Sequence, residues 1–493
     1  MENKREIIKL KQDNLLKIKD GLSAPSYNRK ELRASIVHIG LGNFHRAHQA
    51  AYLDRLLESN VTKSGIYALN LIPDLLPLKS ILSEQDCLYS HITKSSGGEE
   101  KLRISGSIIA YHNACDNMEK AIDILSDNSR SLISLTITEG AYYFIRKSGE
   151  TDVKNPAIID DLNNREDPKT ALACLAAALN RRYKNGRQPL TIMSCDNIPS
   201  NGEVLRKGVM FFIKELYPEI YSWAAEQLSF PSSMVDRITP VSTRELIQEL
   251  EQKYSIKDQW PVCSEDYCQW VLEDNFRTEI PNFAEAGVQL VKNVEPYELM
   301  KMRLLNGSHS AMAYPSQLLG IEMVHDGAKN PLIKSFIRNY FMEEVRQTLA
   351  PVEGIDLDLY MDTLIERFSN INIADTTARL AAEGSSKIPV FMMKSLCEAI
   401  RQKSPCSAMI FAVSAWAYYL NSGIKINDSN MALIAELKQL AKNAPKDFLV
   451  KAGMEDIHND ELEKTANILK TNMENIGNMG IKTAIEAEIA KYQ

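Results

Sequence analysis

The sequence predicts a protein of the α/β class, with a parallel β-sheet in its N-terminal part and a mostly α-helical C-terminal part. Three observations support this prediction. A short apolar run at residues 34–39 ends in Gly-Leu-Gly and is followed by a segment with helical periodicity. Further apolar runs alternate with helical segments as far as about residue 285. From residue 286 onward, long helical patterns dominate the 493-residue chain.

The first predicted strand and helix have the pattern of a dinucleotide-binding unit. Glycines in the turn at residues 40–42 let the backbone approach a pyrophosphate, which then lies at the N-terminus of the helix predicted over residues 43–57. The third glycine of the usual G-x-G-x-x-G pattern is absent, because His45 stands in its place. An ordinary tight turn between strand and helix is therefore the alternative. The prediction is a Rossmann-type domain over residues 1–285.

Three further apolar runs predict the remaining central strands. Strands that are apolar on both faces and alternate with helices indicate a parallel sheet that is covered on both sides. Ligands of such sheets bind at the carboxyl ends of the strands, so Glu139 and Asn197 are candidate cleft residues. Ordinary turn chemistry is the alternative for both. The predicted strands are Gly65–Ile72, Leu132–Thr138 and Pro189–Ser194, and the predicted helices between them include Met118–Leu125 and Lys169–Arg182.

Residues 286–493 predict a mostly helical second domain, which we expect to bind the substrate and carry the catalytic groups. Short turns punctuate its helical patterns, and residues 383–386 are predicted to form a loop. The predicted helices are Tyr297–Tyr314, Leu332–Thr348, Leu357–Phe368, Thr376–Glu383, Met409–Tyr419, Met431–Leu440 and Glu461–Ile476.

The first of these helices carries four polar side chains that suggest chemistry. At about 100° per residue, Glu298, Lys301, Asn306 and His309 fall within an arc of roughly 140°. If burial and nearby cations lower the pKa of Lys301, its amine can take a proton from an alcohol. Asn306 and His309 would then donate hydrogen bonds to the oxygen that becomes negative. The alternative is a solvated polar stripe in which Glu298 and Lys301 form a surface pair.

Composition excludes several classes of function. The net charge is −7 and no long block of lysine and arginine occurs, which argues against a nucleic-acid or membrane partner. The eight cysteines form no CxxC pair, no signal peptide or membrane span is visible, and we expect a soluble cytoplasmic protein with reduced thiols. His45 and His48 lack further ligands, so no metal is expected. The motifs of the common hydrolases and of P-loop phosphate transfer are absent.

Seven motifs together resemble the polyol-specific long-chain dehydrogenases, a family that includes mannitol 2-dehydrogenase, arabinitol 4-dehydrogenase and the fructuronate and tagaturonate reductases. The resemblance covers residues from about 35 to 390, with the motifs in the same order. The motifs are Gly40-Leu-Gly-Asn-Phe-His-Arg-Ala-His48, Leu135-Thr-Ile-Thr-Glu-Gly140, Ser194-Cys-Asp-Asn197, Phe230 to Pro240, Gln269 to Phe276, Lys301 to His309 and Arg367-Phe-Ser-Asn370.

The resemblance implies zinc-independent hydride transfer between a secondary alcohol and a nicotinamide. It implies that Lys301 is the general base in oxidation and the acid in reduction. Asn197 and Asn306 would hold the reacting oxygen, and His309 would hydrogen-bond at the same centre. The remaining implied roles are binding of the other substrate hydroxyls by Asp236, Arg379 and Lys387, proton relay by Glu298 and Glu139, and cofactor binding by the turn residues Gly40, Gly42, Asn43, Phe44, His45 and Arg46.

The cofactor prediction is NAD. Asp74 is the first acid after the second strand and would bind the ribose hydroxyls, and no arginine nearby would hold a 2′-phosphate. The residue at the strand end itself is Asn70, which departs from the usual pattern.

The substrate prediction is a polyol and its ketose, with mannitol and fructose in first place. Residues 377–380 and 384–389 look like mannitol 2-dehydrogenase, whereas residues 68–73 and 303–310 look more like fructuronate reductase. Reduction of fructuronate to mannonate is therefore the alternative. A non-catalytic NAD-binding sensor is a remote alternative, since it would lose the set from Lys301 to Asn306. The oligomeric state is left open, and a monomer is compatible with the sequence.

Overall fold

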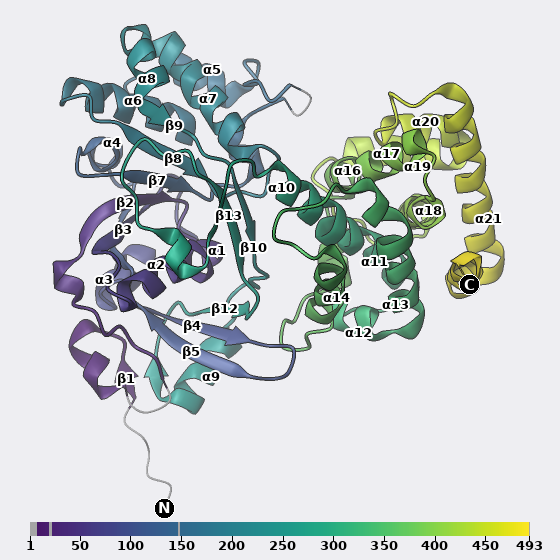
Figure 1. Ribbon diagram of the computed structural model, residues 1–493, viewed down its shortest axis with the longest axis horizontal. Coiled ribbons are helices and arrows are strands. Elements are labelled where there is room, and N and C mark those ends of the chain that lie inside the picture. Colours follow the sequence, from purple (N-terminus) through teal and green to yellow (C-terminus); the bar gives the residue numbers. More distant parts are fainter. Residues whose placement is uncertain (1–6, 19–21, 146–147, 493) are drawn as a thin grey trace, which may run out of the picture. The chain divides into compact units, whose positions relative to one another are not determined.

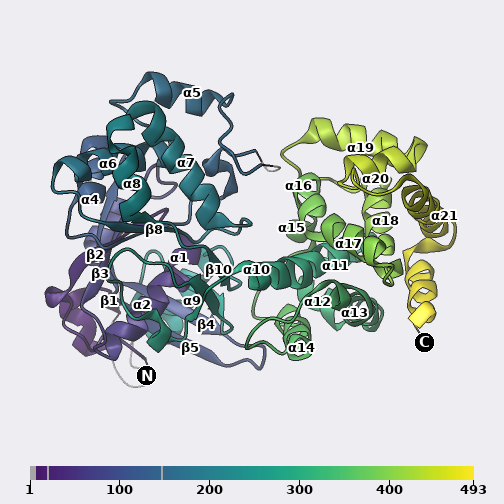
Figure 2. The same cartoon turned by 45° about the horizontal axis from the view of Figure 1, so that its top comes forward.

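The computed structural model describes residues 7–18, 22–145 and 148–492. The chain divides into two compact units, Met1–Glu295 and Pro296–Gln493 (Figures 1 and 2). The domain boundary predicted from the sequence lies after residue 285.

In the described part of the first unit, the largest sheet has six strands and all neighbouring strands are parallel. Its order, β6-β3-β2-β7-β8-β9, is that of a doubly wound dinucleotide-binding sheet, which confirms the predicted fold class. The strands are β2 (Arg33–Ile39), β3 (Ser64–Asn70), β6 (Ile108–Asn113), β7 (Leu132–Leu135), β8 (Leu190–Ser194) and β9 (Leu228–Ser229).

Helices cover both faces of this sheet, and each face has its own apolar core (Figure 1). Strand residues such as Val37 and Ile133 pack with one set of helices, while Ile36 and Ile66 pack with the other. This two-sided burial explains why the central strands are continuous apolar runs. The first set is α4 (Met118–Ser126), α6 (Ala171–Lys184), α7 (Asn201–Leu216) and α8 (Tyr221–Gln227), and the second includes α2 (Gln49–Glu58) and α3 (Leu78–Glu84).

The prediction of a single helix over residues 43–57 is wrong, because the structure has two helices there. The segment forms α1 (Asn43–Ala47) and α2, separated by His48, whose φ of −117° and ψ of −90° are not helical. The His48 ring nitrogen Nε2 lies 2.9 Å from the Gln269 carbonyl oxygen, and its ring contacts Trp270 edge-on at 5.7 Å. These contacts with a distant part of the chain hold the break, and local periodicity gives no sign of them.

Smaller sheets and two helices complete the first unit. Strands β10, β13 and β14 form one sheet, and β12, β4 and β5 another. The sequence did not predict them, because they are short and mix polar with apolar residues. The bounds are β4 (Tyr89–Lys94), β5 (Glu100–Ser105), β10 (Ser233–Asp236), β12 (Val262–Glu265), β13 (Gln269–Glu273), β14 (Gln289–Val291), the paired β1 (Ile8–Lys9) and β11 (Ile256–Lys257), α5 (Pro156–Asn163) and α9 (Arg244–Tyr254).

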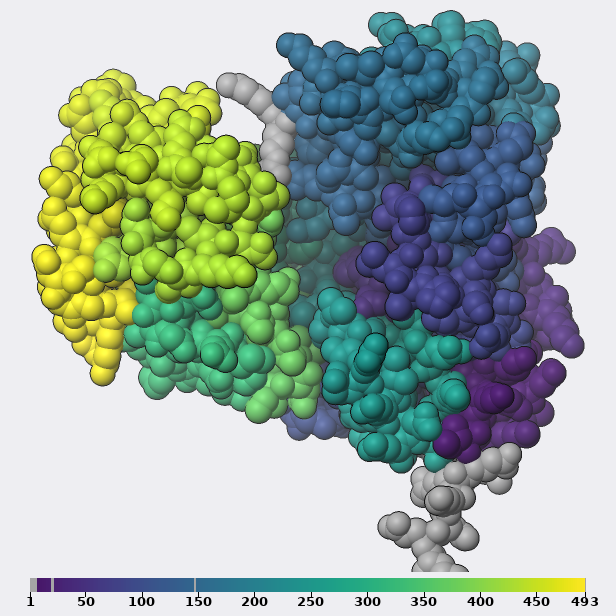
Figure 3. Space-filling model, turned by 180° about the vertical axis from the view of Figure 1, so that it is seen from behind, coloured from purple at the N-terminus to yellow at the C-terminus, as the bar shows by residue number. Residues whose placement is uncertain are grey.

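The second unit is helical, as predicted. Its apolar helix α18 is buried along almost its whole length, and α11, α19 and α21 pack against it. Helix α21 lies at the surface of the unit (Figure 3, yellow). The helices are α10 (Glu295–Lys301), α11 (Gly307–Leu318), α12 (Val324–Lys329), α13 (Pro331–Arg338), α14 (Leu357–Phe368), α15 (Thr377–Ala381), α16 (Gly384–Ile388), α17 (Lys394–Gln402), α18 (Ser407–Asn421), α19 (Met431–Asn443), α20 (Pro445–Lys451) and α21 (Asn459–Ile489).

Several helical predictions need correction in detail. The helix predicted over residues 332–348 changes after Arg338 into a π-helical segment, Asn339–Glu344, and then a 3₁₀ segment. The loop predicted at residues 383–386 falls largely within α16, which begins after Glu383 in the left-handed conformation with φ of 57°. The last helix extends to Ile489, with a break at Gly480.

Among the described residues, no helix combines the length and the apolar composition that crossing a lipid bilayer requires.

Candidate active site

The turn after β2 needs glycine at position 40. Gly40 has a φ of +96°, and a Cβ atom there would lie 2.1 Å from the Thr136 carbonyl oxygen. The Gly40 N–H donates to the Leu69 carbonyl at 2.8 Å, and the Thr136 hydroxyl donates to the Gly40 carbonyl at 2.9 Å. The turn is therefore fixed between β3 and β7. Gly42 then serves as the N-cap residue of α1. This close-packed turn is the kind of cradle that a pyrophosphate needs.

Asp74 is linked to this turn through Asn70. The Asn70 side-chain oxygen accepts from the Leu41 N–H at 2.7 Å, and its amide nitrogen donates to Asp74 Oδ1 at 2.8 Å. The Tyr111 hydroxyl lies 2.6 Å from both Asp74 carboxylate oxygens. Burial and the Asp74 carboxylate raise the pKa of Tyr111, so this hydroxyl stays protonated and donates. The unusual Asn70 at the strand end thus holds the acid in place.

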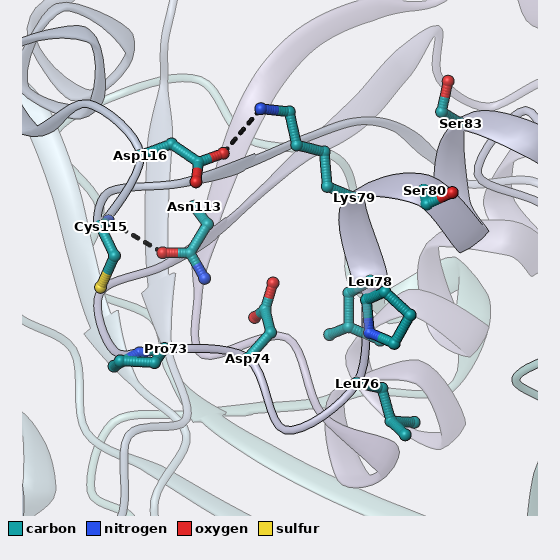
Figure 4. A pocket seen from close by; sticks show the side chains of 11 residues that line it. Pro73, Asp74, Leu76, Leu78, Lys79, Ser80, Ser83, Asn113, Cys115 and Asp116 are labelled. Carbon is teal, nitrogen blue, oxygen red and sulfur yellow. Dashed lines mark hydrogen bonds and ion pairs between the residues drawn. The ribbon is translucent and has the colours of Figure 1, made fainter.

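Asp74 also lines a surface pocket of about 580 Å³. Figure 4 shows its carboxylate in the middle of the pocket, with the 2.7 Å ion pair between Lys79 and Asp116 to one side. Pro73, Leu76 and Leu78 give the pocket apolar walls. A carboxylate beside apolar walls can accept from vicinal hydroxyls while an adjacent planar ring packs on the walls.

His45 and Arg46, two residues of the predicted cofactor turn, are buried inside the unit. The His45 ring stacks on the His38 ring at 3.3 Å, and burial lowers the pKa of His45 well below its usual range. The Arg46 guanidinium lies 3.5 Å from the Trp260 ring centroid and donates to Asn43 Oδ1 at 2.6 Å. Burial lowers the pKa of Arg46 to about 10. These side chains support the turn, and their direct contact with a cofactor stays a prediction.

Asp196 organises the carboxyl ends of β7 and β8. Its carboxylate accepts from the N–H groups of Ile137 at 2.9 Å and Thr138 at 2.8 Å, and from the Tyr142 hydroxyl at 2.7 Å. Thr138 has a φ of +69°, a strained conformation for a β-branched residue that these bonds hold. Burial raises the pKa of the Asp196 carboxyl.

These bonds fix the turns that carry two predicted site residues. Glu139 directly follows the clamped Thr138, and Asn197 directly follows Asp196. Asp196 belongs to the motif Ser194-Cys-Asp-Asn197 but was not predicted to have a role of its own. Its position beside Asn197 in a polar turn was the available signal, but nothing local indicated its bonds across to the neighbouring turn.

Asn201 connects this edge of the sheet to β10. Its side-chain nitrogen donates to the carbonyl oxygens of Asp196 at 3.0 Å and Ser233 at 2.7 Å. Its side-chain oxygen accepts from the Ser233 N–H at 2.9 Å. Strand β10 ends at the buried residue Asp236, so the predicted substrate-binding acid is carried on an element tied to the end of β8.

In the second unit, the helix that carries Lys301 is not a uniform α-helix. Lys301 ends α10, a π-helical segment runs from Met302 to Asn306, and α11 begins at Gly307. The prediction that Lys301 and Asn306 share one face of a regular α-helix is therefore corrected. The π segment between them widens the helical turn, so the angle between the two side chains differs from the value for an α-helix. Segments of this kind occur frequently at functional sites.

Burial excludes the solvated polar stripe as a description of this helix. Glu298 and Lys301 are each 7% exposed. The His309 ring packs against Phe368 with centroids 4.3 Å apart. The amide nitrogen Nδ2 of Asn306 is buried and has no hydrogen-bond partner among the described residues. Since buried donors are nearly always paired in native proteins, this nitrogen is a candidate donor to a ligand oxygen.

Gly307 lets this helix pack closely between two neighbouring segments. A Cβ atom on Gly307 would lie 2.8 Å from the Tyr340 hydroxyl and 3.1 Å from the Phe391 carbonyl oxygen. The residue stands between Asn306 and His309, so its close packing sets the positions of both functional side chains.

Arg379 and Lys387 lie on α15 and α16, which pack on α11. The side chain of Gln317 on α11 donates to the Thr377 hydroxyl at 2.6 Å and so ties α15 in place. Arg379 donates from Nε and Nη2 to the Asp375 carboxylate, which raises the pKa of the guanidinium. Lys387 Nζ donates to the Arg379 carbonyl at 3.4 Å, and burial followed by the Arg379 charge lowers the pKa of this amine.

Across the described ranges, no three histidine, cysteine, aspartate or glutamate side chains come together as a group that could hold a metal ion. The predicted site residues fall into two sets. The first unit carries Gly40, Gly42, Asn43, Phe44, His45, Arg46, Asp74, Glu139, Asn197 and Asp236, and the second carries Glu298, Lys301, Asn306, His309, Arg379 and Lys387.

A doubly wound sheet with a glycine turn after its first strand, together with a buried lysine and an amide donor on one helix, defines a Rossmann-type oxidoreductase. Family comparisons agree with this class. Residues 34–285 match the mannitol dehydrogenase Rossmann domain, and residues 293–477 match the mannitol dehydrogenase C-terminal domain. The chain belongs to the mannitol dehydrogenase family, which confirms the resemblance drawn from the motifs.

Curated relatives and solved structures are similar over nearly the whole chain. The mannitol 2-dehydrogenase of Phaeosphaeria nodorum is 38% identical over 496 residues, which is 98% of this chain and 86% of that protein. The mannitol 2-dehydrogenase of Aspergillus oryzae is 40% identical over 425 residues, which is 84% of each chain. The ternary complex of Pseudomonas fluorescens mannitol 2-dehydrogenase with NAD and D-mannitol has a TM-score of 0.87 at 33% identity, covering 98% of this chain and 100% of that chain.

A substrate-free D-sorbitol dehydrogenase has a TM-score of 0.86 at 32% identity, covering 97% of this chain and all of its own.

Proposed function

We propose that this protein is an NAD-dependent, zinc-independent oxidoreductase that interconverts mannitol and fructose. The observation that carries the proposal is the helical segment with the buried Lys301 and with Asn306. The amide nitrogen of Asn306 has no hydrogen-bond partner among the described residues. A base and a hydrogen-bond donor on one helix are what oxidation of an alcohol requires. The relatives named mannitol 2-dehydrogenase support the choice of substrate.

The residues of the first unit suit a dinucleotide. Gly40 has no room for a side chain, which suits a turn that the pyrophosphate approaches closely. Asp74 offers its carboxylate to the ribose hydroxyls and would repel a 2′-phosphate. A bound nicotinamide would supply the hydride acceptor for alcohol oxidation and the hydride donor for ketone reduction. The solved relative that contains NAD supports this choice of cofactor.

We assign the proton chemistry to this chain's own residues. In oxidation, Lys301 takes the hydroxyl proton as the carbon–hydrogen electron pair leaves as hydride and the carbon–oxygen double bond forms. Asn197 and Asn306 donate to the oxygen while it carries negative charge, and His309 hydrogen-bonds at the same atom. Glu298 passes the proton from Lys301 toward solvent, with Glu139 as a second relay residue. In reduction, each step runs backward and Lys301 acts as the acid.

The other hydroxyls of the polyol would be held by Asp236, Arg379 and Lys387. Carboxylate, guanidinium and ammonium groups together can both accept from and donate to several hydroxyls. We place the protein in the cytoplasm, since all eight cysteines are free thiols, as a reducing compartment would keep them.

One panel of assays tests the proposed function. The purified protein is mixed with NADH and, separately, fructose, fructuronate, tagaturonate or xylulose, and cofactor oxidation is followed by absorbance. Fructose should give the highest kcat/KM, and mannitol should be oxidised with NAD⁺. Failure to turn over any of the four ketoses would overturn the proposed activity, and preference for fructuronate would replace mannitol with a hexuronate.

A further inference from the structure

The charge of one predicted substrate-binding residue is already paired within the fold. Nε and Nη2 of Arg379 both donate to the carboxylate of Asp375. This is the planar two-bond arrangement by which arginine recognises a carboxylate. The edge of the guanidinium that would bind a carboxylate on a substrate is therefore taken by a carboxylate of the protein.

Asp375 is fixed on several sides. Its side chain is 10% exposed and accepts from the Thr376 N–H at 2.9 Å. Its backbone carbonyl accepts from the Val324 N–H at 3.0 Å, and Met323 and Thr376 form a β-bridge. The Arg379 side chain is 62% exposed. The acid is thus the anchored partner, and the arginine is held by it.

The second cation nearby does not restore a binding site for an anion. Lys387 donates to the carbonyl oxygens of Arg379 and Leu380, at 3.4 and 3.3 Å, so backbone carbonyls take two of the three donors of its ammonium group. Two other acids near Lys387 are used elsewhere, since Glu383 accepts from Ser429 and Asp428 accepts from Ser385. Asp375 is the acid that contacts Arg379 directly.

We propose that Asp375 determines substrate specificity by neutralising Arg379, so that the enzyme takes ketoses without a charged group and disfavours ketoses that carry a carboxylate. This inference rests on the proposed function, in which Arg379 contacts the substrate. A neutral polyol needs only hydroxyl contacts, which the exposed part of the guanidinium can still supply. A uronate would have to displace Asp375, or leave it unpaired beside a second negative charge.

A simpler description is that the pair only stabilises the start of α15. In that case, removing the pair should change only the free energy of unfolding and leave the choice of substrate unchanged. The two descriptions differ in what they predict for specificity. A substrate that carries a carboxylate is the probe that separates them.

The test compares kcat/KM for fructuronate and fructose, with NADH, in the parent and in Asp375→Asn. The asparagine keeps an oxygen for the Thr376 N–H but removes the charge. The ratio of fructuronate to fructose should rise by about tenfold or more, which is the usual contribution of a hydrogen bond to a charged group. The gain should lie mainly in KM for fructuronate and shrink at high salt. In Asp375→Asn/Arg379→Gln, the gain should disappear.

Asp362→Asn is the matched control. Asp362 pairs with Arg338 at 2.7 Å on the surface of the same unit, with both side chains about half exposed. This variant also loses an arginine–aspartate pair, one with a single hydrogen bond and a more exposed acid, and should leave the substrate ratio unchanged. Asp375→Ser, which also keeps an oxygen near the Thr376 N–H, replaces Asp375→Asn if the latter does not fold.

An unchanged ratio in a folded Asp375 variant, or the same change in Asp362→Asn, overturns the inference while the proposed function stands. A gain that persists without Arg379 also overturns it. A parent that prefers fructuronate contradicts the inference directly. A parent that reduces neither ketose refutes the proposed function, a result that is distinct from all of these.

Discussion

Replacing Gly307 with alanine tests whether close packing positions the catalytic helix. Gly307 has helical backbone angles, φ −62° and ψ −46°, so alanine alone would stabilise the helix by about 1 kcal/mol. The new Cβ atom, however, would lie 2.8 Å from the fully buried Tyr340 hydroxyl and 3.1 Å from the Phe391 carbonyl oxygen. Overpacking of this kind costs about 1–3 kcal/mol. With the helix gain subtracted, we expect a net loss of up to about 2 kcal/mol in the free energy of unfolding.

The same clash should also reduce activity, because Asn306 and His309 flank Gly307. A displacement of about 1 Å can cost about 10²-fold in rate, so we expect kcat/KM to fall by about tenfold or more. Urea unfolding and steady-state kinetics measure the two effects. Tyr340→Phe removes the oxygen at 2.8 Å, and the double variant should recover part of both losses.

Gly477→Ala is the matched control for this substitution. Gly477 is an exposed residue of α21, and a Cβ atom there would come no closer than 3.6 Å to the Tyr418 ring. Alanine should therefore stabilise the protein by about 0.5–1 kcal/mol and leave activity unchanged. If Gly307→Ala proved as stable and as active as the parent, the reasoning from close packing would be refuted.

Three further predictions concern the cofactor, metals and pH. Asp74→Ala should narrow the preference for NADH over NADPH, and equal efficiency with both cofactors in the parent would contradict the role of Asp74. Dialysis against a strong chelator should leave the rate unchanged, because a lysine supplies the base; a loss that zinc restores would contradict this. Burial raises the pKa of the Glu344 carboxyl to about 7, so folding favours its protonated form. The contribution of this group to the free energy of unfolding is therefore fully present below about pH 4.5 and is lost as pH rises through about 7. Urea unfolding should show that the free energy of unfolding of the parent falls, relative to that of Glu344→Gln, by up to about 3 kcal/mol over this pH range. Parallel pH profiles of the two proteins would contradict the raised pKa of Glu344.

The parts of the fold that the sequence predicted well are those with a local signal. The central strands are apolar on both faces, so residues 34–39 and 189–194 were placed within a residue of β2 and β8. The carboxyl ends of such strands then indicated Glu139 and Asn197. Residues 357–368 were predicted correctly as a helix because the apolar period is regular, and in the structure Asp356 caps the first turn.

The features that were missed depend on contacts between distant residues. The break at His48 is held by Gln269 and Trp270, and nothing in the local pattern requires it. The π segment after Lys301 has the same composition as an α-helix, so periodicity alone cannot identify it. The partners of Asp196 lie in the next turn of the sheet, and its role is visible only once the strands are paired.

Lys301→Ala tests whether Lys301 is the general base. A general base in contact with an alcohol contributes about 10²–10⁴-fold, so mannitol oxidation should fall by at least about 10²-fold while NADH binding, measured by fluorescence, is retained. External primary amines should restore part of the rate, because they can occupy the vacated space and accept the proton. Lys334→Ala, on the exposed face of α13, is the control and should be fully active. A folded Lys301→Ala protein that oxidised mannitol at close to the parental rate would contradict the account and move the proton to Glu298 or His309.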